Sequence, residues 1–207
     1  MSSHKLPLVF TGAGISVGSG LPTFATAVWQ NQPMRDFLHI DYLNIDPAGF
    51  MSLYREALIP WTQATPSQAH KLVAESGYPV VTQNIDELHQ LAGSKEVLEL
   101  HGSIYRFVCP HCQASFDIRR DPELLTNHIP ICLRCDESLR PDIVLFGEMV
   151  NHWDKAMAML EQSSRLIVVG TSLTVYPALL LERMARNIGL RVDIVNEDAD
   201  QNLAEVL

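Results

Sequence analysis

The four cysteines of this chain stand in two Cys-x-x-Cys pairs and constrain the fold more than any other feature. The pairs are Cys109 with Cys112 and Cys132 with Cys135, and the chain has no other cysteine. Their separation suits a zinc site with four cysteine ligands, in which two such turns direct the thiolates to the corners of a tetrahedron. Two disulfides are the alternative. We disfavour them because intracellular thiols stay reduced and a chain of 207 residues can form a core without cross-links.

The expected metal site is closed. Four sulfur ligands leave no position for water or substrate, so we expect a structural metal and look for the chemistry elsewhere in the chain. The segment from residue 109 to about 140 also lacks long apolar runs. Metal binding would therefore take the place of a hydrophobic core in this small module.

Short apolar runs rich in β-branched residues recur along the chain and predict parallel strands that are buried on both faces. These runs span residues 8–10, 79–82, 97–100, 143–146, 166–169 and 192–195. Helical patterns lie between several of them, with apolar residues on one face at 153–160 and 180–188, and a further helix at 67–76. Strands that alternate with helices predict an α/β fold with a doubly wound parallel sheet.

The composition excludes several classes of protein. Hydrophobic residues make up 47% of the chain and charged residues 19%, which is typical of a globular protein. A formal net charge of −9 argues against nucleic acid as a partner, since phosphate binding needs a basic surface. The apolar run near the N-terminus, residues 6–10, is too short for a signal peptide or a membrane span. We therefore expect a cytoplasmic protein with no membrane partner; the sequence does not indicate an oligomeric state.

A glycine turn, Gly12-Ala13-Gly14, follows the first predicted strand and precedes a predicted helix that starts at Ile15. Backbone N–H groups at such a helix start can bind an anion such as a pyrophosphate. The match to a dinucleotide fingerprint is imperfect, because Val17 occupies the third glycine position. An ordinary glycine turn is the alternative, and Ser16 could either bind phosphate or cap the helix.

Polar residues follow further predicted strands, at the edge of the sheet where ligands bind in open α/β folds. These clusters span residues 82–86, 170–172 and 196–198. A single cluster of this kind is usually a helix cap, whereas several together favour a nucleotide-binding crevice. His101 follows the run 97–100. It could act as a general base, since histidine titrates near neutrality, or it could form a structural hydrogen bond.

These motifs, taken in order, resemble the sirtuin family, in a bacterial-type form with an atypical cofactor loop. The matching stretches cover most of the chain and comprise residues 11–16, 19–22, 82–86, 88–89, 99–103, the paired cysteines, 140–148, 169–173 and 195–196. The resemblance implies a Rossmann-like sheet that binds NAD, a small zinc module with four cysteine ligands, and removal of acyl groups from lysine side chains of protein substrates. The cofactors implied are NAD and Zn²⁺, and the products are nicotinamide and O-acyl-ADP-ribose.

The resemblance also assigns roles to individual residues. The implied catalytic residues are His101, Asn84 and Asp86, with His101 as the base. The implied cofactor-binding residues are Gly12, Ala13, Gly14, Ser16, Phe24, Gln83, Asn84, Ile85, Asp86, His101, Gly170, Thr171, Ser172 and Asn196. The implied substrate-binding residues are Val144, Phe146, Gly147 and Glu148. The domain division that follows is residues 1–22, 66–108 and 141–207 for NAD binding, 23–65 for the cofactor loop and a helical insertion, and 109–140 for zinc.

The chain departs from the family pattern in the cofactor loop. Ala25 stands where the family usually has an arginine of the NAD pocket, and the loop looks short, from Phe24 to Trp29. Such a change could redirect the reaction to ADP-ribosyl transfer or NAD hydrolysis, and a non-catalytic module that binds NAD and zinc is a second alternative. Relatives that remove acidic acyl groups have a tyrosine three residues before an arginine. Here Ser52 precedes Arg55, which favours acetyl or another uncharged group.

Overall fold

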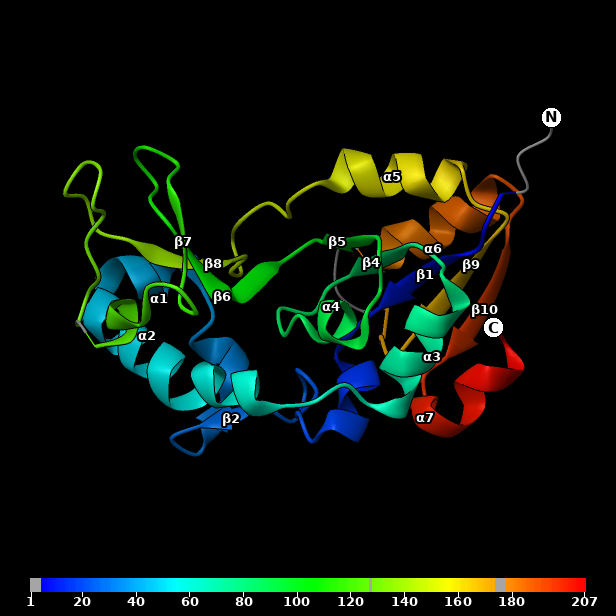
Figure 1. Cartoon of the computed structure of the whole chain (residues 1–207), viewed down its shortest axis with the longest axis horizontal. Helices are drawn as coiled ribbons and strands as arrows, with labels where there is room; N and C mark the ends of the chain where they lie inside the picture. Colours follow the sequence, from blue (N-terminus) through cyan, green and yellow to red (C-terminus); the bar gives the residue numbers. More distant parts are fainter. Residues whose placement is uncertain (1–4, 127, 174–177) are drawn as a thin grey trace.

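The computed structural model describes residues 5–126, 128–173 and 178–207. It has two parts that lie side by side along the longest axis (Figure 1). One part is built on a parallel sheet and the other on a smaller antiparallel sheet with helices. We call them the parallel-sheet half and the small half.

The parallel sheet has the strand order β10-β9-β1-β4-β5. Its strands are β1 (Leu8–Thr11), β4 (Val80–Thr82), β5 (Val97–Glu99), β9 (Arg165–Val169) and β10 (Arg191–Val195). All neighbouring pairs run parallel. Strand β1 is central, and every one of its residues is buried because helices cover both faces.

Alternate residues of β1 face opposite layers of helices. Leu8 and Phe10 belong to a core with α5 (Trp153–Glu161) and α6 (Ala178–Asn187), whereas Val9 belongs to a core with α3 (Gln68–Ser76) and α7 (Ala199–Asn202). This arrangement confirms the doubly wound α/β fold that the sequence predicts. The short helix α4 (Leu88–Ala92) follows β4.

Helix α3 forms where its boundary residues predict. The Ser67 side chain accepts a hydrogen bond from the backbone N–H of His70, and the His70 ring accepts one from the Ser67 backbone, which makes a capping box. Gly77 ends the helix with a φ of 68°, a conformation that glycine adopts without steric cost.

The small half contains the antiparallel sheet β7-β6-β8. Its strands are β6 (Gly102–Val108), β7 (Ser115–Asp117) and β8 (Arg140–Ile143). The helical insertion packs on it, and comprises α1 (Ile40–Ile45), α2 (Pro47–Leu53), a π-helical turn (Tyr54–Leu58) and a 3₁₀ helix (Ile59–Gln63). A small hairpin, β2 (Val28–Trp29) and β3 (Gln32–Pro33), precedes α1.

The prediction of a parallel strand at residues 143–146 is wrong. The chain forms β8 slightly earlier, at Arg140–Ile143. This strand pairs antiparallel with β6, a strand that the sequence did not predict. Ile143 and Leu145 are buried in the core of the small half. An apolar run of this kind is hydrophobic whichever sheet it joins, so its pattern does not reveal the partner strand.

The small half has a hydrophobic core of its own. Phe50 and Tyr54 of the helical insertion pack with Phe107 of β6 and with Cys109 and Cys132. The expectation that metal binding replaces a core is therefore wrong, because the cysteines lie at the edge of an apolar cluster shared with residues 23–65. The predicted domain boundaries stay a prediction. Within the described ranges, no helix is long and apolar enough to span a membrane.

Candidate active site

The glycine turn lies tightly against the end of β9. Gly14 donates a backbone hydrogen bond of 2.7 Å to the carbonyl of Gly170. A Cβ atom at Gly14 would lie 2.5 Å from the Cα of Gly170, so no side chain fits there. Residues Ala13–Ser19 form a 3₁₀ helix instead of the helix predicted from Ile15 onward. Glycine thus occupies the positions where two backbones meet.

Asn84, Ser16 and Asp86 form a buried hydrogen-bonded cluster beneath this turn. The side-chain amide of Asn84 donates to the carbonyl of Gly12 at 3.2 Å and to Ser16 Oγ at 3.1 Å. Ser16 Oγ in turn donates to Asp86 Oδ2 at 2.7 Å. The other Asp86 oxygen accepts from the backbone N–H of Leu88 at 3.0 Å. The cluster holds two polar loops, after β1 and after β4, in a single arrangement.

The environment of Asp86 is unusual for a carboxyl group. Burial raises the pKa of Asp86 above its ordinary value, while the hydrogen bonds from Leu88 and Ser16 oppose that rise. A buried carboxyl with a shifted pKa beside a strand end is a frequent feature of functional sites.

Gln83, Thr171 and Asn196 connect further strand ends. Thr171 Oγ1 donates to Gln83 Oε1 at 3.0 Å, and the backbone N–H of Thr171 donates to Asn196 Oδ1 at 3.1 Å. These residues follow β4, β9 and β10. The carboxyl ends of neighbouring parallel strands therefore bring these polar residues together at one edge of the sheet, as the sequence predicts.

His101 lies between β5 and β6 and is partly exposed. Burial lowers the pKa of His101, with a hydrogen bond at the Gln83 backbone acting in the opposite direction. The imidazole is therefore neutral at pH 7 and able to accept a proton. Gly102 follows with a φ of 78°, and a Cβ there would lie 1.9 Å from the Asp142 carbonyl. Only glycine lets β8 approach the chain directly after His101.

Phe24 of the predicted cofactor loop contacts Phe146 of the predicted substrate segment. Their ring centroids are 5.4 Å apart with planes tilted by 45°. Phe146 is also held by its backbone, which accepts a hydrogen bond from Ile40 and donates one to Leu38. Both rings remain more than one third exposed. A partly exposed aromatic pair thus joins the predicted cofactor loop to the predicted substrate segment.

Other predicted site residues occupy varied surroundings. Glu148 binds Arg140 through both carboxylate oxygens and accepts from the backbone N–H of Leu145 at 2.9 Å. Its charge is therefore paired within the small half. Ile85 packs against the core of the small half, Val144 is partly buried, and Gly147 and Ser172 are exposed.

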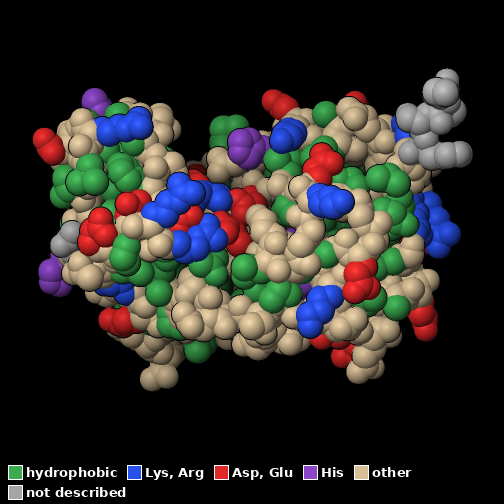
Figure 2. Space-filling view, in the orientation of Figure 1, with side chains coloured by type: hydrophobic (Ala, Val, Ile, Leu, Met, Phe, Trp, Pro, Cys, Tyr) green, Lys and Arg blue, Asp and Glu red, His purple; other side chains and the backbone are tan. Residues whose placement is uncertain are grey.

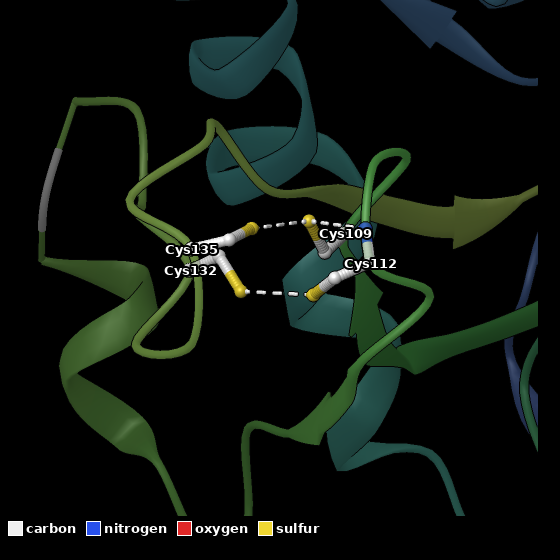
Figure 3. Close-up of side chains that lie close together, drawn as sticks. All are labelled: Cys109, Cys112, Cys132 and Cys135. Atoms are coloured by element: carbon white, nitrogen blue, oxygen red, sulfur yellow. Dashed lines mark hydrogen bonds between the residues drawn. The ribbon is translucent and has the colours of Figure 1, made fainter.

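The four cysteine side chains converge as the sequence predicts (Figure 3). All their sulfur atoms lie within 4.8 Å of one another. The Sγ atoms of Cys109 and Cys135 are 3.5 Å apart, and those of Cys112 and Cys132 are 3.6 Å apart. Tetrahedral zinc with Zn–S bonds of about 2.3 Å would place sulfurs about 3.8 Å apart, whereas a disulfide requires about 2.05 Å.

Backbone groups complete this metal site. The N–H of Cys112 points at Cys109 Sγ and the N–H of Arg134 points at Cys132 Sγ, each at 3.4 Å. Such donors stabilise thiolates, the form that binds metal. All four cysteines are free, so the disulfide alternative is wrong. The cysteines lie between β6 and β8 of the small half, and none of them belongs to the polar strand ends of the parallel sheet, which suits a structural zinc.

A hydrogen-bonded group that the sequence did not predict lies next to these strand ends. Thr11 Oγ1 lies 3.0 Å from His89 Nε2 and donates to Thr82 Oγ1 at 2.8 Å, and Thr82 Oγ1 accepts from the backbone N–H of Asn84. Glu87, a buried acid next to Asp86, was not predicted either. The run of polar residues at 82–89 is the only signal for either.

A doubly wound sheet with a glycine turn and polar strand ends, joined to a four-cysteine module, defines a dinucleotide-binding α/β protein with a structural zinc site. Residues 12–177 match the model of the Sir2 family, and the chain belongs to that family. This confirms the resemblance to sirtuins.

Several relatives resemble the chain over nearly all of its length. An NAD-dependent protein deacetylase of Caldivirga maquilingensis is 39% identical, with 95% of this chain and 79% of that protein covered. A solved structure of a Sir2 protein with a p53 peptide and NAD⁺ has a TM-score of 0.84 and 33% identity over 97% of this chain and 91% of that one. A Sir2 structure with an acetylated peptide has a TM-score of 0.85 and 32% identity, again covering 97% and 91%.

Proposed function

We propose that this protein is an NAD-dependent protein lysine deacylase that acts mainly on acetyl-lysine and releases nicotinamide and O-acyl-ADP-ribose. The observation that carries this proposal is the buried cluster of Asn84, Ser16 and Asp86 under the glycine turn, with the neutral His101 near the same strand ends. Relatives at 34–39% identity are NAD-dependent protein deacetylases or deacylases.

The cofactors fit the residues present. Gly12 and Gly14 let the turn pack closely against Gly170 and Thr171, and backbone N–H groups at the start of the helix Ala13–Ser19 could then bind a pyrophosphate. The remaining contacts to NAD would come from Ser16, Phe24, Gln83, Asn84, Ile85, Asp86, His101, Gly170, Thr171, Ser172 and Asn196. When bound, NAD supplies the ribose carbon that receives the acyl oxygen. Zinc, held by the four cysteines, stabilises the small half and takes no part in the reaction.

His101 serves as the general base in this proposal. Its lowered pKa keeps the ring unprotonated at neutral pH, so it can accept a proton from a ribose hydroxyl. Asn84 and Asp86 hold the reacting part of the site. Because the cluster with Ser16 restricts both side chains, little reorganisation is needed when substrates bind.

The acyl-lysine substrate would bind along Val144, Phe146 and Gly147, with its backbone added as a strand. The N–H and C=O of Phe146 already bond to Leu38 and Ile40, so its backbone groups would exchange partners when a strand is added there, whereas Gly147 is exposed beside it. Glu148 supports this segment through its hydrogen bonds to Arg140 and Leu145. Its role is therefore to orient the segment.

The acyl preference follows from the surroundings of Arg55. Its guanidinium lies 3.4 Å from the carbonyl of His128, which belongs to residues 109–140, here called the cysteine module. Ser52 occupies the position of the tyrosine found in relatives that bind acidic acyl groups. Both features favour an acetyl or other uncharged acyl group over succinyl or malonyl.

ADP-ribosyl transfer or NAD hydrolysis is a second candidate, and Ala25 is the observation that favours it. Ala25 is exposed in the cofactor loop, where the family pattern has an arginine. Without that side chain the loop can admit water or a protein nucleophile. A cytoplasmic location and the absence of a nucleic-acid partner stay predictions.

One assay separates the candidates. The zinc-loaded protein is incubated with NAD and lysine peptides carrying acetyl, propionyl or succinyl groups, and products are identified by mass spectrometry. O-acetyl-ADP-ribose and free lysine support the proposal. Free ADP-ribose or ADP-ribosylated protein would support the second candidate instead. If nicotinamide release stays at background with every peptide, the protein is a non-catalytic module.

A further inference from the structure

Glu87 is a buried acidic residue next to the proposed catalytic residues, and none of the roles above uses it. It follows Asp86 directly and is only 8% exposed. Its backbone is in the left-handed region, with φ 56° and ψ 19°. A non-glycine residue in this conformation is strained and persists only where its surroundings hold it.

Both carboxylate oxygens of Glu87 are bound by arginine. Oε1 accepts from Arg106 Nη1 at 3.2 Å and from the Ser103 hydroxyl, and Oε2 accepts from Arg119 Nη1 at 2.9 Å. Because the carboxylate is buried, loss of its partners would leave an uncompensated charge inside the protein. The two arginines therefore hold Glu87 in place.

Arg119 belongs to the cysteine module and is itself fixed there. It follows β7, forms hydrogen bonds to Asp117 through Nε and Nη2, and lies 4.4 Å above the Tyr105 ring. Arg106 of β6 also binds Glu99 and Asp142. Figure 2 shows Lys and Arg side chains beside Asp and Glu side chains where the two halves meet.

Glu87 is thus the point at which this charged network meets the loop that carries Asn84 and Asp86. Asp86, the residue immediately before Glu87, accepts the hydrogen bond from Ser16 with its side chain. A shift of the Glu87 backbone out of the left-handed region would displace Asp86, since consecutive Cα atoms are about 3.8 Å apart. The ion pair between Arg119 and Glu87 therefore connects the cysteine module to the loop at residues 83–86.

We propose that Glu87 is a positioning residue that couples the cysteine module to the NAD-binding loop at residues 83–86. This inference rests on the proposed function, since it takes that loop to hold NAD. Arg119 and Arg106 fix the Glu87 carboxylate, which in turn fixes the orientation of Asp86.

The test compares Glu87→Gln with a matched control, Asp193→Asn. Asp193 of β10 is also a carboxylate between two arginines, at 3.0 Å from Arg165 and 2.8 Å from Arg191, but it lies outside the polar loops. Coupling of this kind typically changes affinity by roughly 3- to 30-fold. We expect Glu87→Gln to raise the KM for NAD by such a factor and leave the KM for acetyl-peptide unchanged. Asp193→Asn should lower Tm but change neither the KM for NAD nor the KM for acetyl-peptide.

Arg119→Met provides a milder variant, since the Arg119 side chain is 49% exposed and methionine can still cover the Tyr105 ring. We expect it to raise the KM for NAD in the same direction. The double variant with Glu87→Gln should be no worse than Glu87→Gln alone. Additive effects in the double variant would overturn the inference.

Amide hydrogen exchange at residues 83–87 gives a readout that does not need activity. Exchange should be faster in Glu87→Gln than in the wild-type protein and unchanged in Asp193→Asn. Equal exchange in all of these proteins rejects the coupling. If the wild-type protein releases no nicotinamide while exchange changes as expected, the proposed function fails and the coupling stands.

Discussion

The hydroxyl of Ser16 donates a hydrogen bond of 2.7 Å to Oδ2 of Asp86, although the two residues are 70 positions apart in the chain. They belong to the loops that follow β1 and β4, which are neighbours in the parallel sheet. The bond therefore links the glycine turn to the polar loop. Together with the hydrogen bonds of Asn84 to Gly12 and Ser16, it joins two sequence motifs into one site.

Replacement of Ser16 by alanine tests this link. A buried acceptor left without its donor costs about 1–3 kcal/mol, so Ser16→Ala should lower the free energy of unfolding by that amount and raise the KM for NAD. Chemical denaturation and steady-state kinetics measure the two effects. Ser164→Ala is the control, because Ser164 is exposed. An unchanged KM for NAD would show that the link is not needed for binding.

His101→Ala should abolish deacylation. Removal of a positioned general base typically costs roughly 10²- to 10⁴-fold in rate, and the protein should remain folded and keep its zinc. The measurement is the rate of O-acetyl-ADP-ribose formation, with Tm and zinc content as checks. Replacement of the exposed His128 by alanine serves as control. A fully active His101→Ala protein contradicts the assignment of the base.

Acid should destabilise the protein through a pair of buried histidines. Burial lowers the pKa of His70 to about 4, which Asp200 partly opposes, and lowers that of His89 to about 3, with His70 adding to the effect. Unfolded histidine titrates near 6.5, so below that pH the unfolded chain binds more protons and stability falls with falling pH. The stability is complete above about pH 6.5 and declines toward pH 4.

At pH 5 each of these histidines should reduce the free energy of unfolding by about 2 kcal/mol relative to pH 7. Denaturation curves between pH 4.5 and about 7 measure the slope. His70→Gln should remove the contribution of one histidine from the dependence of the unfolding free energy on pH. His128→Gln, at an exposed position, should leave this dependence unchanged. Equal slopes in the wild-type protein and His70→Gln would contradict the prediction.

Zinc removal should destabilise the small half. The purified protein should contain about one zinc per chain, because the four cysteines supply one tetrahedral site. Chelation should expose all four thiols to a thiol reagent and lower Tm, since metal binding contributes directly to folding free energy. Cys132→Ser should behave like the chelated protein. A metal-free protein with an unchanged Tm would exclude a structural role for the site.

Much of this protein could be predicted from local patterns. The buried strands β1, β4 and β9 were indicated by continuous apolar runs, and α3 by its boundary residues. The edge strand β10 was also predicted, but most of it is partly or fully exposed instead of buried on both faces. The convergence of polar strand ends was also predictable. Once the strands are parallel, their carboxyl ends meet at one edge of the sheet. The cysteine spacing likewise identified the metal site, because both turns bring ligands together within a few residues.

Local patterns were enough to predict the α/β class, the four-cysteine site and most of the residues at the polar strand ends. The sheet that residues 140–143 join, the core that the cysteines share with the helical insertion, and the arginines that bind Glu87 are known only from the folded molecule. The physical reason is the range of the interactions. Periodicity and spacing report on neighbours within a few residues, whereas strand partners and buried ion pairs depend on segments that meet only after folding.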